Sequence, residues 1–182
     1  MAKVKGTILV DFVKTIKADK TGVYSRYLGP EDMDIVSRRV LPSAWYPYET
    51  FKHCFNAVFE VAAKKNLETV RDWGKLYGNQ IMSDVYRGLL KQGEPLEYLK
   101  KYSVYIKNFF DFGKVEVIEE KPRQVLVKFL EFDHEFAPLY YMIFGWLEKT
   151  AELCGAKNLQ SEIVARSWQD PVDTAFRFRW TA

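Results

Sequence analysis

The chain has 182 residues, of which 48% are hydrophobic and 28% charged, and its formal net charge is +3. These values are typical of a globular domain with a buried core, and they exclude a disordered or fibrous protein. The small net charge gives no support for nucleic-acid binding. Aromatic residues make up 16% of the chain, so we expect an aromatic-rich interior.

Apolar residues recur at helical spacing through the first two-thirds of the chain. We expect helices over residues 7–17, 21–28, 30–39, 47–65, 66–91 and 95–112, with Thr7 and Asn66 as N-caps. Between them, the segment 41–48 carries two prolines and three aromatic residues, which predicts a stiff, packed connector.

Gly74 and Gly78 lie four residues apart on the apolar face of the helix expected over 66–91. Each glycine costs about 1 kcal/mol relative to alanine inside a helix. We therefore expect them to mark a close approach, either by another backbone or by a ligand.

The last third of the chain predicts strands over 114–119 and 124–132, a helix over 138–154 and a hairpin of strands 159–168 and 173–180. In the last strand, Phe176, Phe178 and Trp180 alternate with Arg177 and Arg179, so the aromatic side chains should face the core. The fold class is therefore α+β: a helical N-terminal layer followed by β-β-α-β-β, with a four-stranded antiparallel sheet. No composition shift divides the chain, so residues 1–182 are predicted to form a single domain.

The two cysteines, Cys54 and Cys154, form no Cys-x-x-Cys pair and no disulfide framework. Reduced, buried thiols in a cytoplasmic protein are expected. The longest apolar stretch, 137–147, is about half of the roughly 20 residues that a membrane helix needs. We therefore predict a cytoplasmic protein without a membrane span.

Five segments of the chain carry a resemblance in their order and spacing. They are Leu41-Pro42-Ser43-Ala44-Trp45-Tyr46-Pro47, Gly74-Lys75-Leu76-Tyr77-Gly78, Phe112-Gly113-Lys114-Val115-Glu116-Val117, Gly145-Trp146, and Asp170-Pro171 with Phe178-Arg179-Trp180. Together they resemble a family of bacterial proteins of about this length that is multiplied in myxobacteria. That family is similar to a superfamily of vinyl-four-reductase ligand-binding domains, haem-based nitric-oxide sensors and TRAPP-type trafficking subunits.

This resemblance implies a helical layer and a β-β-α-β-β half with an apolar cavity between them. Members of the superfamily bind phenols, tetrapyrroles, haem or acyl chains, and many dimerise. We therefore expect a homodimer or another protein partner, but fold similarity alone does not transfer a ligand.

Haem needs an axial ligand, usually His, Cys, Met or Tyr. His53 falls on the polar side of its helix and His134 lies in an acidic loop, so both are expected at the surface. The nitric-oxide sensors carry a Tyr-x-Ser-x-Arg signature, whereas Tyr24-Ser25-Arg26 is contiguous and too early to match. No cofactor is therefore predicted, and a haem or tetrapyrrole site using His53, Cys54 or Tyr48 stays an alternative.

Other chemistries lack their motifs. The last hairpin has no cysteine for zinc, and the chain has no phosphate loop and no nucleophile elbow. The acidic clusters at 119–120 and 131–135 fall in expected turns and loops, where solvated charge is usual. The sequence therefore predicts no metal, no nucleic-acid partner and no enzymatic activity.

An apolar pocket is the remaining kind of site, and such pockets are lined mostly by aromatic and aliphatic side chains. Ordinary core packing is the alternative for each residue. The expected walls are Trp73, Tyr77, Gly78, Ile81, Phe109, Phe110, Tyr140, Phe144 and Trp146.

We accordingly predict non-enzymatic binding of a small hydrophobic molecule, in a sensor or signalling module. The alternative is a dimeric protein-interaction module with a closed pocket. An exposed aromatic patch at 45–48, or on the outward side of the helix over 51–59, would favour that alternative.

Overall fold

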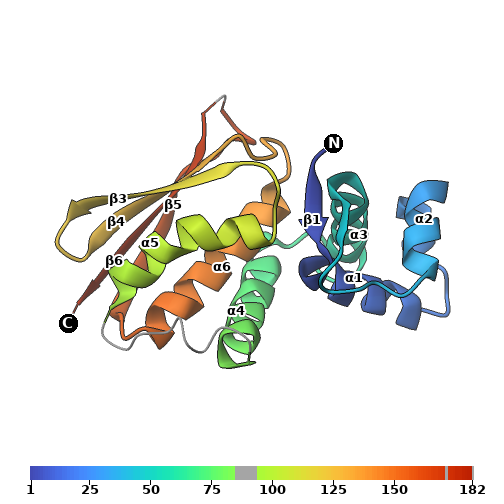
Figure 1. The fold of residues 1–182 in the computed structure, drawn as a ribbon, viewed down its shortest axis with the longest axis horizontal. Helices are drawn as coiled ribbons and strands as arrows, with labels where there is room; N and C mark the ends of the chain where they lie inside the picture. Colours follow the sequence, from blue (N-terminus) through green and yellow to red (C-terminus); the bar gives the residue numbers. More distant parts are fainter. Residues whose placement is uncertain (85–93, 171, 182) are drawn as a thin grey trace. The chain divides into compact units, whose positions relative to one another are not determined.

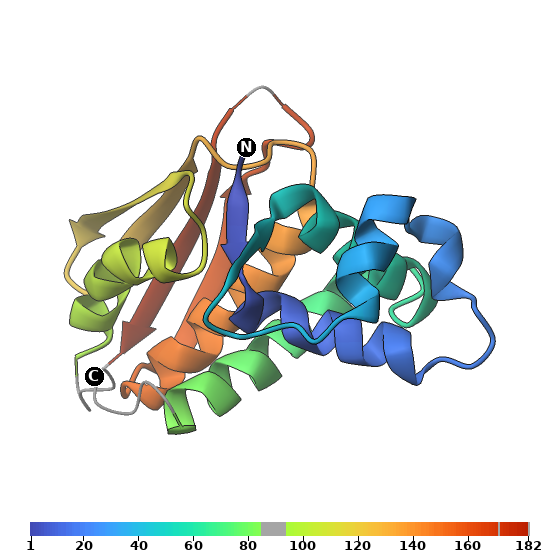
Figure 2. The same ribbon diagram turned by 45° about the vertical axis from the view of Figure 1, so that its right-hand side comes forward.

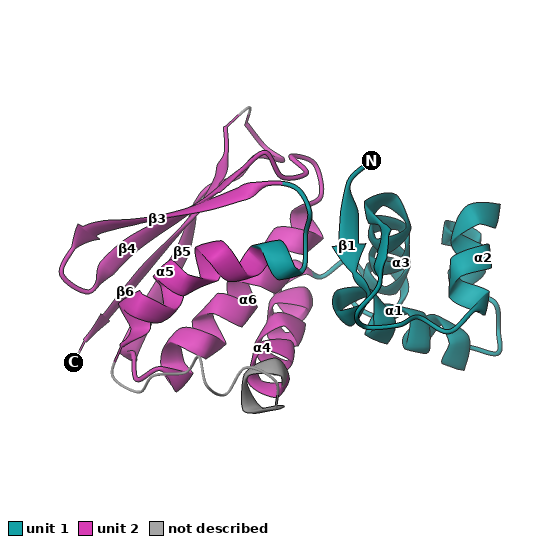
Figure 3. Ribbon diagram, in the orientation of Figure 1, with its two compact units in different colours: residues 1–66, 107–112 teal, residues 67–106, 113–182 magenta. Residues whose placement is uncertain are grey.

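The computed structural model describes residues 1–84, 94–170 and 172–181, with the side chains of 81–84 excluded. Two compact units divide the chain, as Figure 3 shows: Met1–Asn66 with Lys107–Phe112 form unit 1, and Leu67–Ile106 with Gly113–Ala182 form unit 2. The expectation of a single domain stays a prediction. The fold class is confirmed: helices dominate the first part, and a four-stranded antiparallel sheet follows.

Unit 1 is mainly helical, with its elements in the order β1 (Lys3–Lys5), α1 (Gly6–Ala18), η1 (Tyr24–Tyr27), α2 (Pro30–Ser37), β2 (Trp45–Pro47) and α3 (Tyr48–Val61). Its core is aromatic, because the Phe12 and Phe55 rings stack with centroids 4.5 Å apart and Phe51 meets Phe12 edge-on. The prediction of Thr7 as an N-cap is wrong. The helix begins at Gly6 after Lys5, and the Thr7 hydroxyl donates to the Pro42 carbonyl at 3.0 Å.

A small sheet in unit 1 was not predicted. β1 and β2 pair antiparallel, with Val4 opposite Tyr46, so the segment expected to be only a connector contains a strand. The far side of β1 is paired too, since the Lys5 amide donates to the Phe109 carbonyl and the Asp111 amide to the Lys3 carbonyl. The helix predicted over 95–112 therefore ends early, as α5 (Pro95–Tyr105) and a short 3-10 turn, η3 (Ile106–Asn108).

Unit 2 contains α4 (Leu67–Asp84), α5, β3 (Lys114–Lys121), β4 (Gln124–Leu130), α6 (Ala137–Leu153), β5 (Lys157–Ala165) and β6 (Thr174–Thr181). The strands lie in the order β3-β4-β6-β5, all antiparallel. Within this unit, α5 and α6 lie against one face of the sheet, and α4 packs on α6 (Figures 1 and 2). Part of the helix predicted over 66–91 lies outside the described residues.

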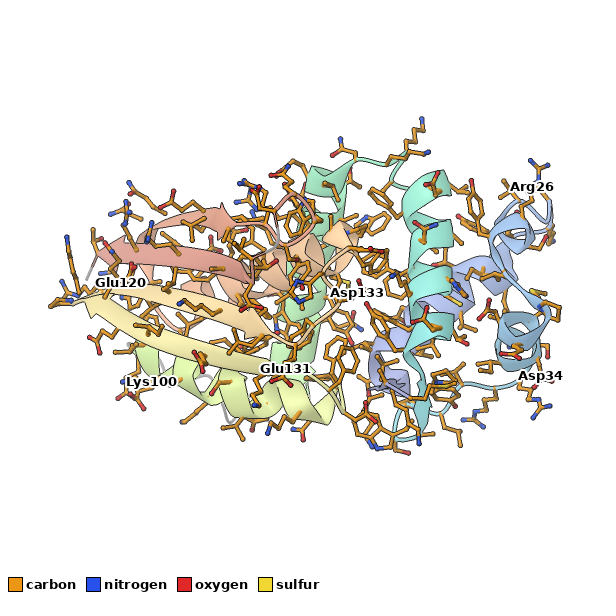
Figure 4. All side chains as sticks on the ribbon, turned by 90° about the horizontal axis from the view of Figure 1, so that it is seen from above. Arg26, Asp34, Lys100, Glu120, Glu131 and Asp133 are labelled. Atoms are coloured by element: carbon orange, nitrogen blue, oxygen red, sulfur yellow. The ribbon has the colours of Figure 1, made fainter. Side chains whose placement is uncertain are left out.

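The sheet face toward α6 is aromatic, as the alternation in the last strand predicted. Phe176 and Phe178 are fully buried, and both rings contact Phe144 of α6. On the opposite face, Arg177 pairs with Glu120 at 2.8 Å. Lys100 of α5 and Glu120 at the end of β3 lie at the periphery of unit 2 (Figure 4). In the part of the chain that the structure describes, no helix has the length and apolar character of a membrane span.

Candidate functional site

Three glycines allow α4 and α6 of unit 2 to approach closely. A Cβ atom on Gly74 would overlap the Met142 carbonyl, and one on Gly145 would overlap the Arg71 carbonyl. Of the two readings left open by the sequence, Gly74 therefore serves the approach of another backbone. Gly78 accommodates a side chain instead, because a Cβ there would lie 2.7 Å from the Trp146 ring.

Trp146 is the centre of a group of polar-tipped aromatic residues between α4, α5 and α6. Tyr77 and Tyr102 both meet its ring edge-to-face, with centroids 5.7 Å and 5.6 Å away. Tyr98 lies one turn before Tyr102 on the same face of α5. These residues together with Thr150 are called the tyrosine cluster below.

The tyrosine cluster runs from the surface of unit 2 into its core. Tyr77 is half-buried on α4, whereas Tyr98 and Tyr102 retain 4% and 1% exposure. Burial raises the pKa of both α5 phenols, and a hydrogen bond with Thr150 opposes this rise for Tyr98. Both phenols are therefore neutral near pH 7, and each can donate one hydrogen bond.

The two phenols differ in their hydrogen bonds. Tyr98 is hydrogen-bonded to Thr150, whose own hydroxyl also donates to the Trp146 carbonyl at 2.9 Å. The hydroxyl of Tyr102 has no hydrogen-bond partner among the described residues. A buried donor left in this state costs about 1–3 kcal/mol, so it is the group in the cluster that gains most from a ligand.

The other predicted pocket residues lie elsewhere. Trp73 is half-buried on α4, and Tyr140 and Phe144 belong to the core between α6 and the sheet. Phe109 and Phe110 belong to unit 1, where the Phe110 ring meets Phe51 and Phe112. The side chain of Ile81 lies outside the described residues. Within unit 2, the structure thus brings together Tyr77, Gly78 and Trp146 from the expected set.

Tyr98, Tyr102 and Thr150 were not among the expected site residues. The available signal was a pair of tyrosines spaced by four in the helix expected over 95–112. Aromatic residues on an apolar helix face usually belong to the core, so this spacing alone did not distinguish them.

A buried ion pair between α4 and α6 was also missed by the sequence analysis. Glu148 retains 4% exposure and pairs with Arg71 of α4, while the Ser161 hydroxyl of β5 donates to the same carboxylate. Lys75 approaches it at 3.6 Å, and the Arg71 guanidinium lies 4.8 Å from the Phe144 ring centroid. This carboxylate is satisfied by three side chains from two elements, α4 and β5, which is typical of a structural group.

Unit 1 holds a separate cleft of about 240 Å³, lined by Ile16, Tyr24, Met33 and Val36 and by polar residues at its rim. That volume is below the roughly 300–1,000 Å³ of common ligand pockets. No buried polar group faces outward here to orient a ligand, as far as the described lining residues show. The tyrosine cluster is therefore the stronger candidate.

The two histidines and Cys54 are not part of the tyrosine cluster. His53 places its Nδ1 atom 2.8 Å from the buried Asp32 carboxylate, and His134 is exposed before α6. Burial and, to a smaller extent, the charge of Asp32 raise the pKa of the Cys54 thiol to about 12. Among the described residues, no three His, Cys, Asp or Glu side chains gather as a metal site would require.

No protein-family model matches the sequence. No curated protein is similar enough to match either. Solved structures do match over nearly the whole chain, and they are H-NOX (haem-nitric-oxide-binding) proteins. An H-NOX protein from S. oneidensis in the Fe(II)NO ligation state is 11% identical with a TM-score of 0.69, covering 98% of this chain and 99% of its own.

Two further matches agree. An oxygen-binding H-NOX domain related to soluble guanylate cyclases is 14% identical with a TM-score of 0.65, covering 98% of this chain and 95% of its own. A mutant H-NOX from T. Tengcongensis is 13% identical with a TM-score of 0.66 and covers 98% of both chains. These matches show that the chain shares the fold of the H-NOX structures. The myxobacterial-type, vinyl-four-reductase and TRAPP resemblances stay predictions.

Another similar structure concerns haem distortion in the H-NOX family. A haem would need an axial ligand from this chain, and each candidate side chain has unfavourable surroundings. The only two histidines are half-exposed beside a carboxylate or exposed in a loop. Burial keeps the Cys54 thiol and the α5 phenols protonated, whereas iron prefers thiolate or tyrosinate. Tyr48, the last candidate, is buried against the Phe51 and Phe112 rings. The chain thus has the fold of H-NOX domains, with a donor set that does not fit their haem.

Proposed function

We propose that this chain is a non-enzymatic domain that binds a small hydrophobic ligand at the tyrosine cluster of unit 2 and acts as a sensor. The buried Tyr102 hydroxyl carries the proposal, because it is a fixed donor in an aromatic environment with no protein partner among the described residues. Ligand sites typically combine such an apolar wall with few polar groups. The fold shared with H-NOX proteins agrees with a ligand-binding role.

The half-buried side of the cluster supplies the route of entry in this proposal. Tyr77 lies between solvent and Trp146, and Gly78 adds no second side chain beside the Trp146 ring. A ligand that displaces the Tyr77 ring would reach Trp146 first and Tyr102 next.

The alternative of an interaction module finds less support at the segment 45–48. Trp45 is exposed, but the Lys5 ammonium lies 4.3 Å from its ring centroid. Tyr46 and Pro47 are half-buried and Tyr48 is buried, so the exposed apolar area there is small. The large rings Phe51 and Phe55 of α3 are buried, so they add no exposed apolar area to that helix. A homodimer and a cytoplasmic location remain predictions.

The test is an NMR titration of the full chain with toluene, following the five indole N–H signals and assigning Trp146 by a Trp146→Phe variant. We expect the Trp146 signal to shift and saturate, while Trp45 of unit 1 serves as the internal control and stays constant. The absence of a saturable shift at Trp146, or one at Trp45 instead, would contradict the proposal.

A further inference from the structure

The contrast between Tyr98 and Tyr102 defines what the tyrosine cluster can recognise. Both phenols are buried on one face of α5, and both Tyr98 and Tyr102 lie beside Trp146. Among the described residues, the Tyr98 hydroxyl is hydrogen-bonded to Thr150 and Trp146, whereas the Tyr102 hydroxyl has no hydrogen-bond partner. A ligand that displaces neither helix therefore meets, at Tyr102, a donor that has no partner among the described residues.

Among the described residues, the charges near the tyrosine cluster are paired or exposed to solvent. On α5, Lys100 is exposed and pairs with Glu97 at 3.6 Å. It is two residues from both Tyr98 and Tyr102, so helical spacing places it on the opposite side of α5. On α6, Glu148 is paired with Arg71 and Lys75. A charged ligand would lose its hydration at Tyr102 without gaining a counter-ion, so a neutral molecule is favoured.

We infer that Tyr102 is the recognition donor of this chain, and that it selects a small, neutral, largely apolar molecule with an oxygen acceptor in place of an iron porphyrin. This inference rests on the proposed function, because it needs a ligand to enter the cluster. It also explains why the chain can keep an H-NOX fold with no histidine in the interior of either unit. A phenol that remains protonated donates a hydrogen bond well and binds iron poorly.

Two isosteric probes test the donor. Cyclohexanone carries a carbonyl oxygen, and methylenecyclohexane has a carbon in its place, so they differ in one acceptor. We expect cyclohexanone to bind the full chain about fivefold more tightly in the NMR titration, as one neutral hydrogen bond predicts. Tyr102→Phe should abolish this difference, and Tyr141→Phe, whose ring meets Trp168 outside the tyrosine cluster, should retain it as the control.

Haemin tests the other half of the inference. Mixed with the purified full chain, it should give no stoichiometric Soret band of a coordinated haem. A one-to-one coordinated complex would overturn the inference, and its loss in His53→Ala, His134→Ala or Tyr102→Phe would identify the ligand.

The outcomes separate the two proposals. Equal affinity for the two isosteres, or a preference that survives Tyr102→Phe, overturns the inference about Tyr102 and leaves the proposed function standing. If neither isostere nor toluene shifts the Trp146 signal, the proposed function itself fails. A Tyr102-dependent preference for the ketone together with an unchanged haemin spectrum supports the inference.

Discussion

Two buried polar groups, one in each unit, differ in whether they are paired. In unit 1, the Asp32 carboxylate retains 5% exposure, accepts the Gly29 amide at 2.9 Å and lies 2.8 Å from His53 Nδ1. In unit 2, Tyr102 is buried more deeply, and its hydroxyl has no partner among the described residues. Buried polar groups are normally satisfied, so the carboxylate is explained by structure alone. The phenol calls for a further role.

The largest expected effect comes from Glu148 of unit 2, which is a buried and paired carboxylate like Asp32. Glu148→Gln removes the charge that Arg71 and Lys75 share and should lower the free energy of unfolding by about 3 kcal/mol. Urea unfolding of the full chain measures it. Glu68→Gln is the matched control, since its exposed pair with the same Arg71 should be worth less than about 1 kcal/mol. Equal losses in the two variants would show that the buried carboxylate is not structural.

Asp32 should give the next largest effect. Asp32→Ala removes the acceptor for the Gly29 amide at the start of α2 and the contact with His53, at a cost of about 2 kcal/mol. The control is Asp34→Ala in the same helix, whose exposed pair with Arg38 should contribute less than about 1 kcal/mol. If Asp32→Ala unfolds at the same urea concentration as Asp34→Ala, the claim that the paired Asp32 carboxylate stabilises unit 1 is contradicted.

Cys54 gives a pH-dependent test of burial in unit 1. Its pKa rises from the ordinary 9.0 to about 12, so the unfolded chain loses the thiol proton first as the pH increases. The stabilisation is complete below pH 9 and is lost between pH 9 and pH 12, by about 1 kcal/mol from pH 9 to pH 10. Cys54→Ala should lose less stability over this interval in chemical unfolding at each pH. Parallel curves for both proteins would contradict the buried, protonated thiol.

Much of the fold could be predicted because side-chain periodicity reports burial. Phe176 and Phe178 alternate with arginines, and their strand has one aromatic face and one charged face. The pairing of β1 was missed because its three residues are too few to show a period. The helix over 95–112 was extended too far because the apolar Phe109–Phe110 continued its pattern, whereas hydrogen bonds to β1 hold that backbone.

The site was predictable only in part. Gly74 and Gly78 signalled a close approach correctly, since a glycine inside a helix needs a reason. Sequence could not distinguish Tyr102 from Tyr98, because their difference is one hydrogen bond to Thr150 from another helix. Nor could it separate Phe110 from Trp146, which the chain places in different units.

The most direct test of the unpaired phenol compares the free energies of unfolding of Tyr102→Phe and Tyr98→Phe without ligand. Removing the Tyr102 hydroxyl removes a buried donor that has no described partner, so the variant should be as stable as the parent chain or more stable. Tyr98→Phe loses its bond to Thr150 and should lose about 1 kcal/mol. We therefore expect Tyr102→Phe to be more stable than Tyr98→Phe. A Tyr102→Phe variant destabilised as much as Tyr98→Phe would show that its hydroxyl is already engaged in the folded chain, and would contradict the central claim.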